Sequence, residues 1–114
     1  MAFIEFGNEG ASNGVTAVTM VAAPRKTGVK HVIRWWSVYN PDATAQKAKV
    51  QINKNGTKRL IWASASLAQF VSESKEQVVV LEGTDESLEL LLTSAPAATQ
   101  WDFCVAYAQV DNTE

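Results

Sequence analysis

Residues 46–63 read QKAKVQINKNGTKRLIWA and form the clearest strand–turn–strand pattern in the chain. The first half alternates apolar with polar residues, as in a strand that is buried on one face and solvated on the other. Its apolar positions are Ala48, Val50 and Ile52, and its polar positions are Lys47, Lys49, Gln51 and Asn53. Asn55-Gly56 follows, and this pair favours a two-residue turn because both positions need positive φ. The segment therefore predicts a β-hairpin of strands 46–54 and 57–63.

Outward from this hairpin, apolar and β-branched runs alternate with Gly, Pro, Asn and Asp at short intervals. The further predicted strands are 2–6, 15–22, 29–39, 77–81, 87–93 and 100–110. In the last of them large residues alternate with small ones, so the large side chains are expected to face the core. These are Trp101, Phe103, Val105 and Tyr107. Residues 64–76 are Ser-rich and are predicted to form an extended loop with at most one helical turn.

About eight short strands predict an all-β fold, an antiparallel β-sandwich that is jelly-roll-like. An immunoglobulin-like sandwich is the alternative, although the chain has one cysteine and so lacks the paired cysteines that often mark that fold. A length of 114 residues, 46% of them hydrophobic, and a formal charge of -2 suit one soluble globular domain. We expect this domain to span residues 15–114.

Residues 1–14 are predicted to be an N-terminal arm and flexible link. The link, residues 7–14, holds three glycines and no large side chain. The apolar residues of the arm are Phe3, Ile4 and Phe6. Two alternatives stay open, because the arm can pair as an edge strand of its own domain or dock on another protein by adding a strand to it.

The composition offers few residues for catalysis or ligand binding. His31 and Cys104 are the single histidine and cysteine, and both lie in apolar strand segments where structural roles are expected. Asp85, Glu86 and Glu89 lack the ligand pattern of a calcium loop and are predicted to be solvated. We therefore expect no enzymatic activity, no cofactor and no metal ion.

Charge and hydropathy argue against nucleic-acid-binding proteins and membrane proteins. A pI of 5.4 argues against general nucleic-acid binding. The apolar runs are too short for a membrane helix, and the N-terminus lacks the basic start and apolar stretch of a signal peptide. Neither a nucleic-acid partner nor a membrane is expected.

Charge is unevenly distributed along the chain. Residues 25–59 contain nine of the ten Lys and Arg, whereas residues 76–114 contain eight acids and no Lys or Arg. These halves either balance as two solvated faces of one molecule or make basic and acidic faces that meet between subunits. Trp35 and Trp36 are adjacent in a strand, so one of them must face outward. Because Arg34 and Trp36 share a face of a regular strand, that face is the predicted interface.

Several motifs, taken in order, carry a resemblance to a known family. They are VAAP (21–24), SVYNPD (37–42), KRLI (58–61), the loop containing Leu67, LEGTDESLE (81–89) and DFCVAY (102–107). In this order the chain resembles the small β-sandwich virion proteins of tailed bacteriophages over about residues 15–110. Proteins of this kind serve as capsid decoration (cement) proteins or as parts of tails and fibres.

The resemblance implies a decoration protein on the capsid exterior, made in the host bacterial cytoplasm. Its partners would be the major capsid protein and further copies of itself, with a trimer at local three-fold positions as one arrangement. Phe3, Ile4 and Phe6 would form the docking arm, and Arg34 and Trp36 would contribute to oligomer or shell contacts. The alternative is a tail or head-fibre component that binds a receptor or glycan through an outward tryptophan.

Overall fold

The fold is all-β, as the alternation of the sequence predicted. The structure, a computed structural model, describes residues 2–12 and 16–111. Within them it forms β1 (Ala2–Ser12), β2 (Val18–Val21), β3 (Val29–Asn40), β4 (Ala48–Lys54), β5 (Thr57–Ala63), β6 (Val71–Leu81), β7 (Glu86–Leu92) and β8 (Trp101–Asp111). In this described part, no helix is long and apolar enough to cross a membrane.

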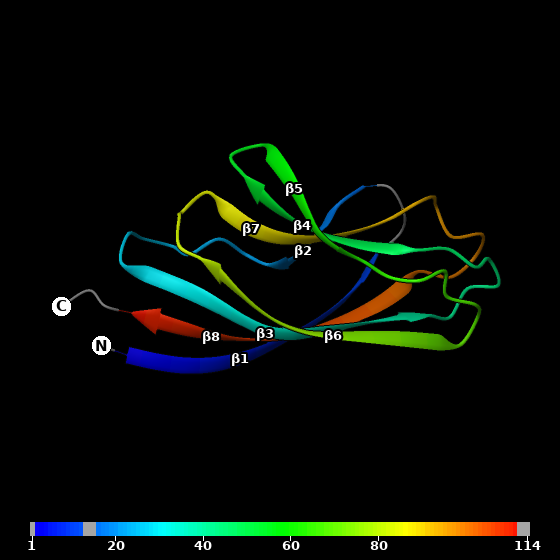
Figure 1. The fold of residues 1–114 in the computed structure, drawn as a ribbon, viewed down its shortest axis with the longest axis horizontal. Helices are drawn as coiled ribbons and strands as arrows, with labels where there is room; N and C mark the ends of the chain where they lie inside the picture. Colours follow the sequence, from blue (N-terminus) through cyan, green and yellow to red (C-terminus); the bar gives the residue numbers. More distant parts are fainter. Residues whose placement is uncertain (1, 13–15, 112–114) are drawn as a thin grey trace.

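Two four-stranded sheets face each other, and all their strand pairs are antiparallel (Figure 1). Their strand orders are β1-β8-β3-β6 and β2-β7-β4-β5. The first strand pairs with the last, the second with the seventh, the third with the sixth and the fourth with the fifth. These pairs make one long antiparallel ribbon, and rolling it places β3 beside β8 and β4 beside β7. The predicted jelly-roll-like sandwich is confirmed.

The β4–β5 hairpin turns at Asn55-Gly56, where the sequence predicted it. Asn55 has φ 51° and Gly56 has φ 89°, the positive values that this turn requires. The apolar face predicted for β4 is confirmed, because Ala48, Val50 and Ile52 are buried in the core, whereas Gln51 of the face predicted to be solvated is buried too.

The core fills the space between the sheets. Trp36 and Trp101 are its largest fully buried side chains. Trp36 packs edge-on against Trp62, with ring centroids 5.9 Å apart. The large residues of β8 face inward as predicted, since Trp101, Phe103 and Val105 are buried and Tyr107 is partly buried against the same cluster. Removal of this apolar surface from water is the main favourable contribution to folding.

The N-terminal segment is part of a sheet. Residues 2–12 form β1, which pairs along its length with β8. Residues 7–12, predicted to belong to a flexible link, therefore continue the strand, because their backbone pairs with β8. Gly10 allows this approach, since a Cβ there would lie 2.7 Å from the Phe103 ring. Residues 13–15 of the predicted link lie outside the described residues.

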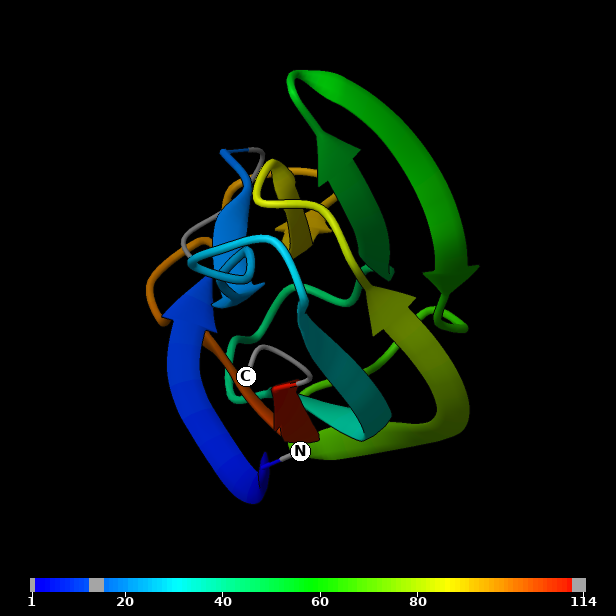
Figure 2. The same ribbon diagram turned by 90° about the vertical axis from the view of Figure 1, so that its left-hand side faces the viewer.

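The sixth strand begins earlier than predicted. Residues 71–76, assigned to a loop from their serines and charges, pair with β3 from Val71 to Leu81. Their side chains are mostly exposed, so the hydrophobic pattern gave no strand signal there. As a result β1 and β6, each eleven residues long, form the two edges of the same sheet, and they lie on opposite sides of the molecule in Figure 2.

Candidate interaction surface

Exposed apolar side chains gather along one edge of the sandwich. The described residues include six large hydrophobic side chains that are exposed: Trp35, Leu60, Phe70, Val71, Val78 and Val80. Val71, Val78 and Val80 belong to β6, Phe70 directly precedes that strand, and Trp35 lies opposite Glu76 of β6 in the β3–β6 register. We call these five residues, all six except Leu60, the β6 patch. An apolar surface of this kind, beside an edge strand, is a candidate interaction site.

A β-bulge decides which tryptophan faces outward. The pairing of β3 with both neighbours shifts between Ile33 and Trp35, so the alternation of faces changes phase there. Trp36 is consequently 0% exposed and lies in the core, whereas Trp35 is 38% exposed. The prediction that Trp36 lines an interface with Arg34 is therefore wrong for this fold, because it assumed a regular strand. Arg34 is exposed at the bulge, beside Trp35.

Phe70 is held in an unusual backbone conformation. Its φ is 66°, in the left-handed region that non-glycine residues rarely adopt, and its side chain is 68% exposed. The conformation is fixed by a 2.6 Å hydrogen bond from the Phe70 N–H to the Asn40 carbonyl oxygen. Strain of this type persists only where surrounding contacts hold it, and it is concentrated at functional positions. A strained backbone conformation thus accompanies an aromatic side chain that is exposed to solvent.

The loops at one end of the sandwich are joined by two buried polar residues of the predicted Asn40-Pro41-Asp42 break. The Asn40 side chain donates from Nδ2 to the carbonyl oxygens of Thr44 and Leu67, and its Oδ1 accepts from the Asp42 N–H. Asn40 and Asp42 are both buried. Loops 41–47, 64–70 and 93–100 meet here, at the right-hand end of Figure 1. We call Asn40 and Asp42 the loop clamp.

The Asp42 carboxylate accepts backbone hydrogen bonds from two loops. The donors are the N–H groups of Ala98 (2.9 Å), Ala97 (3.0 Å), Thr99 (3.0 Å) and Thr44 (3.1 Å). These donors, Ala98 foremost, outweigh desolvation and hold the pKa of Asp42 well below its ordinary value. The carboxylate stays ionised and links the loops.

Glu89 is not solvated as predicted. It lies on β7, is buried, and its two carboxylate oxygens accept from the side-chain amides of Gln51 at 2.8 Å and Asn53 at 3.1 Å. Gln51 was likewise expected on a solvated face and is buried. The cross-strand amide partners satisfy the carboxylate, and such pairing is what permits burial of a charged group. Glu86 is half-buried and forms a 3.5 Å ion pair with Lys54.

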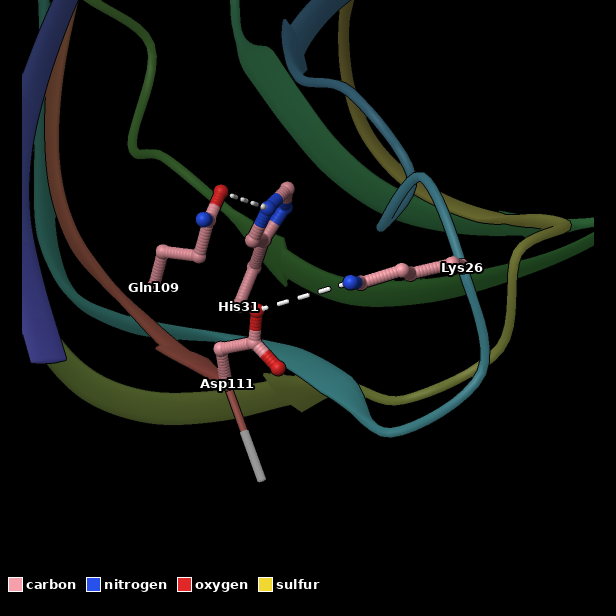
Figure 3. A network of polar contacts seen from close by, with 4 residues as sticks. All are labelled: Lys26, His31, Gln109 and Asp111. Atoms are coloured by element: carbon pink, nitrogen blue, oxygen red, sulfur yellow. Dashed lines mark hydrogen bonds and ion pairs between the residues drawn. The ribbon is translucent and has the colours of Figure 1, made fainter. Parts of the chain in front are cut away.

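His31 lies in a polar network at the opposite end of β3 from the loop clamp (Figure 3). Its Nδ1 is 2.8 Å from the Ala22 carbonyl oxygen, which only accepts, so Nδ1 carries a proton. Its Nε2 faces Gln109 Oε1 at 3.4 Å, and nearby Lys26 forms a 3.8 Å ion pair with Asp111. His31 is buried and joins β3 to the loop before it and to β8, a structural arrangement.

A shallow hollow of about 410 Å³ adjoins this network. It is lined by Arg25, Lys26, Val29, Gln109 and Asp111. Cys104 is half-buried on β8 and forms no disulfide. Over residues 2–12 and 16–111, no group of three or more His, Cys, Asp or Glu side chains is placed to hold a metal ion.

The residues predicted for the docking arm lie in β1. In register, Phe3 is opposite Val110, Ile4 is opposite Gln109 and Phe6 is opposite Tyr107. The side chains of these three residues lie outside the described part of the structure. Their backbone forms the edge of the sheet opposite to β6, so the structure separates the predicted arm from the β6 patch.

Comparison with known proteins finds similar folds in proteins of different origins. No protein-family model matches the chain, and no curated protein matches it in sequence. Among solved structures, it is similar to a structure of infectious bursal disease virus, Gx strain, with TM-score 0.58 and 12% identity over 99% of this chain and 33% of the other. A VP2 subviral particle of the same virus gives TM-score 0.57 and 14% identity over 95% and 32%.

A second kind of similar structure is close to this chain in length. A subunit of the disulfide-linked pili that form Bacillus endospore appendages gives TM-score 0.53 and 12% identity over 98% of this chain and 88% of the other. By contrast, the chain spans about a third of the length of the viral chains that it matches. At these identities the likeness shows the fold, an antiparallel β-sandwich shared by proteins that build particles and fibres.

Proposed function

We propose that the chain is a non-enzymatic structural protein of a virus particle, a decoration protein that binds across neighbouring major-capsid subunits of a tailed bacteriophage. The observation that carries this proposal is the β6 patch, because five of the six large apolar side chains that are exposed among the described residues lie along one edge. Such a surface is stabilised by contact with another protein. The likeness of the fold to virus-particle structures and the motif resemblance to phage virion proteins support a place on a virus particle.

Two separate edges suit the two contacts that a decoration protein needs. The β6 patch is the proposed surface for contact between copies, with Trp35 in the role first predicted for Trp36, and Arg34 beside it. The β1 edge, with Phe3, Ile4 and Phe6, is the proposed capsid contact, since an edge strand can accept a strand from another chain. Many copies on a shell multiply a modest contact.

Co-sedimentation with capsids tests this function. The probe is the emptied capsid of the virus that encodes the chain, stripped of bound accessory proteins. Wild type is expected to co-sediment, and a variant with Phe3→Ser, Ile4→Thr and Phe6→Ser is expected to lose most of that binding. Leu60→Ser, on an exposed residue of the other sheet, is the matched control and should bind like wild type. Absence of the wild-type chain from the capsid pellet would contradict the decoration role.

A glycan-binding module of a tail or head fibre is the second candidate, favoured by Trp35 alone. A half-exposed indole on a sheet face is a platform on which a sugar ring can stack. However, its register neighbours across the strands are Ala106 and Glu76, so only one of them supplies a polar group for sugar hydroxyls. A glycan array separates the candidates, because specific sugar binding that Trp35→Ala abolishes would favour the fibre component.

A further inference from the structure

β6 is an open edge strand. It pairs with β3 on one side, and no other strand of the described residues pairs with its second side. Backbone N–H and C=O groups along that side are therefore available to another strand, and long exposed edges of this type are the usual sites of strand addition. The bound strand must match both the apolar residues and the charges of β6.

The two faces of β6 alternate regularly. Val79 and Leu81 point into the core, so odd-numbered residues lie on the inner face, although Val71 at the start of the strand is exposed beyond the core. Even-numbered residues, including Ser74 and Val78, lie on the outer face. In an antiparallel pair, directly opposed side chains share a face. A two-fold pair of β6 strands must therefore set odd residues against odd residues and even against even.

This condition allows the pair to be centred on any residue of β6, and charge selects among these registers. A pair centred on Glu73 opposes two glutamates, and a pair centred on Lys75 opposes two lysines, both of which are unfavourable. The register midway between them is centred on Ser74 and places Glu73 of each copy opposite Lys75 of the other. Centring on Glu76, at the next even position, again opposes like charges.

We propose that two copies of the chain associate through their β6 strands in a two-fold antiparallel pair centred on Ser74, which joins their sheets into one. The same register brings Phe70 of each copy beside Val78 of the other. These are the two most exposed large hydrophobic side chains in the described residues, at 68% and 71%. Charge and apolar exposure thus favour one register independently.

The two-fold pair deepens the proposed function by naming a second copy as the occupant of the β6 patch. The pair rests on the proposed function in one respect, which is that a decoration protein needs contacts between folded copies. It also differs from the trimer considered from the sequence, because an isologous pair closes on itself at two copies. Capsid binding is assigned to β1, so the two proposals fail in different experiments.

Engineered cysteines test the register. In a Cys104→Ala background, Ser74→Cys is expected to give a disulfide-linked dimer on mild oxidation, because opposed strand residues meet the Cα distance that a disulfide needs. Ser72→Cys and Glu76→Cys should not cross-link to themselves, since each is about 14 Å along the strand from its own copy. A mixture of these two variants should give the mixed dimer. Equal cross-linking of all samples, or none with Ser74→Cys, overturns the register.

A charge swap tests the pairing without cysteines. Glu73→Lys and Lys75→Glu should each weaken dimerisation about tenfold by opposing like charges, and the double variant should restore it. Analytical ultracentrifugation over a concentration series measures the dimer, and circular dichroism checks that each variant is folded. A wild-type chain that stays monomeric, or forms trimers, overturns the proposal. Capsid co-sedimentation of the same samples then shows separately whether the decoration function stands.

Discussion

The loop clamp and the β6 patch differ in whether their side chains are buried and bonded within the chain. At the loop clamp, Asn40 and Asp42 are buried and their side-chain oxygens and nitrogen are bonded within the same chain. Along the β6 patch, apolar side chains are exposed and one side of the strand has no strand partner in the described residues. The difference separates residues that hold the fold from residues that remain available to another molecule. Substitutions in the two regions should therefore affect different measurements.

The largest effect is expected at Asn40. Asn40→Ala removes three hydrogen bonds, the buried ones to Leu67 and Asp42 and a partly buried one to Thr44, and should lower the free energy of unfolding by about 3 kcal/mol. Urea denaturation measures the loss. Gln69→Ala is the matched control, because its side chain donates an exposed hydrogen bond to the Pro41 carbonyl oxygen in the same loops. A similar loss for both variants would mean that the clamp has no special role.

A pH series sharpens the role of Asp42. Because the pKa of Asp42 is lower in the folded chain than its ordinary value of about 3.9, its contribution to stability is fully present above that value. The contribution is lost as pH falls from there toward the lowered folded pKa. Asp42→Asn should therefore be less stable than wild type at pH 7, and the difference should shrink below about pH 4. Denaturation midpoints at both pH values measure this, and parallel curves would contradict it.

Much of the fold was predictable from local patterns. The β4–β5 hairpin follows from alternation around Asn55-Gly56, and residues 57–63 form β5 with the predicted bounds. Inward-facing residues in β8 follow from the alternation of large and small side chains. These signals are carried by residues close in sequence, so no tertiary information is needed to interpret them.

The interaction surface was harder to predict, for two physical reasons. The bulge between Ile33 and Trp35 depends on pairing with β6 and β8, and nothing in the local sequence reveals it. It moved Trp36 into the core and left Trp35 outside. Edge strands also carry polar residues on both faces, so residues 71–76 had no hydrophobic period. The sequence shows the valines of β6, but it does not show that Val71, Val78 and Val80 are exposed.

A smaller effect, of opposite sign, is expected at Phe70. Phe70→Gly relieves a left-handed conformation and should leave stability unchanged or raise it by up to about 1 kcal/mol. The same variant should weaken dimerisation, because it removes an apolar side chain from the proposed pair. Thermal denaturation and analytical ultracentrifugation measure the two effects. A clear loss of stability would show that the exposed ring contributes to the fold of its own domain.

The smallest effect on stability is expected at Val78, and it gives the sharpest form of the comparison. Val78 is 71% exposed, so Val78→Ser should change the free energy of unfolding by less than about 0.5 kcal/mol. Leu60→Ser, at an exposed residue of β5, should be equally mild. The two variants should differ in association, because only Val78 lies in the β6 patch, and dimer formation should fall for Val78→Ser alone. Equal association of both variants would mean that the apolar exposure along β6 is the ordinary exposure of a sheet edge. Only the loop clamp would then have a distinct role.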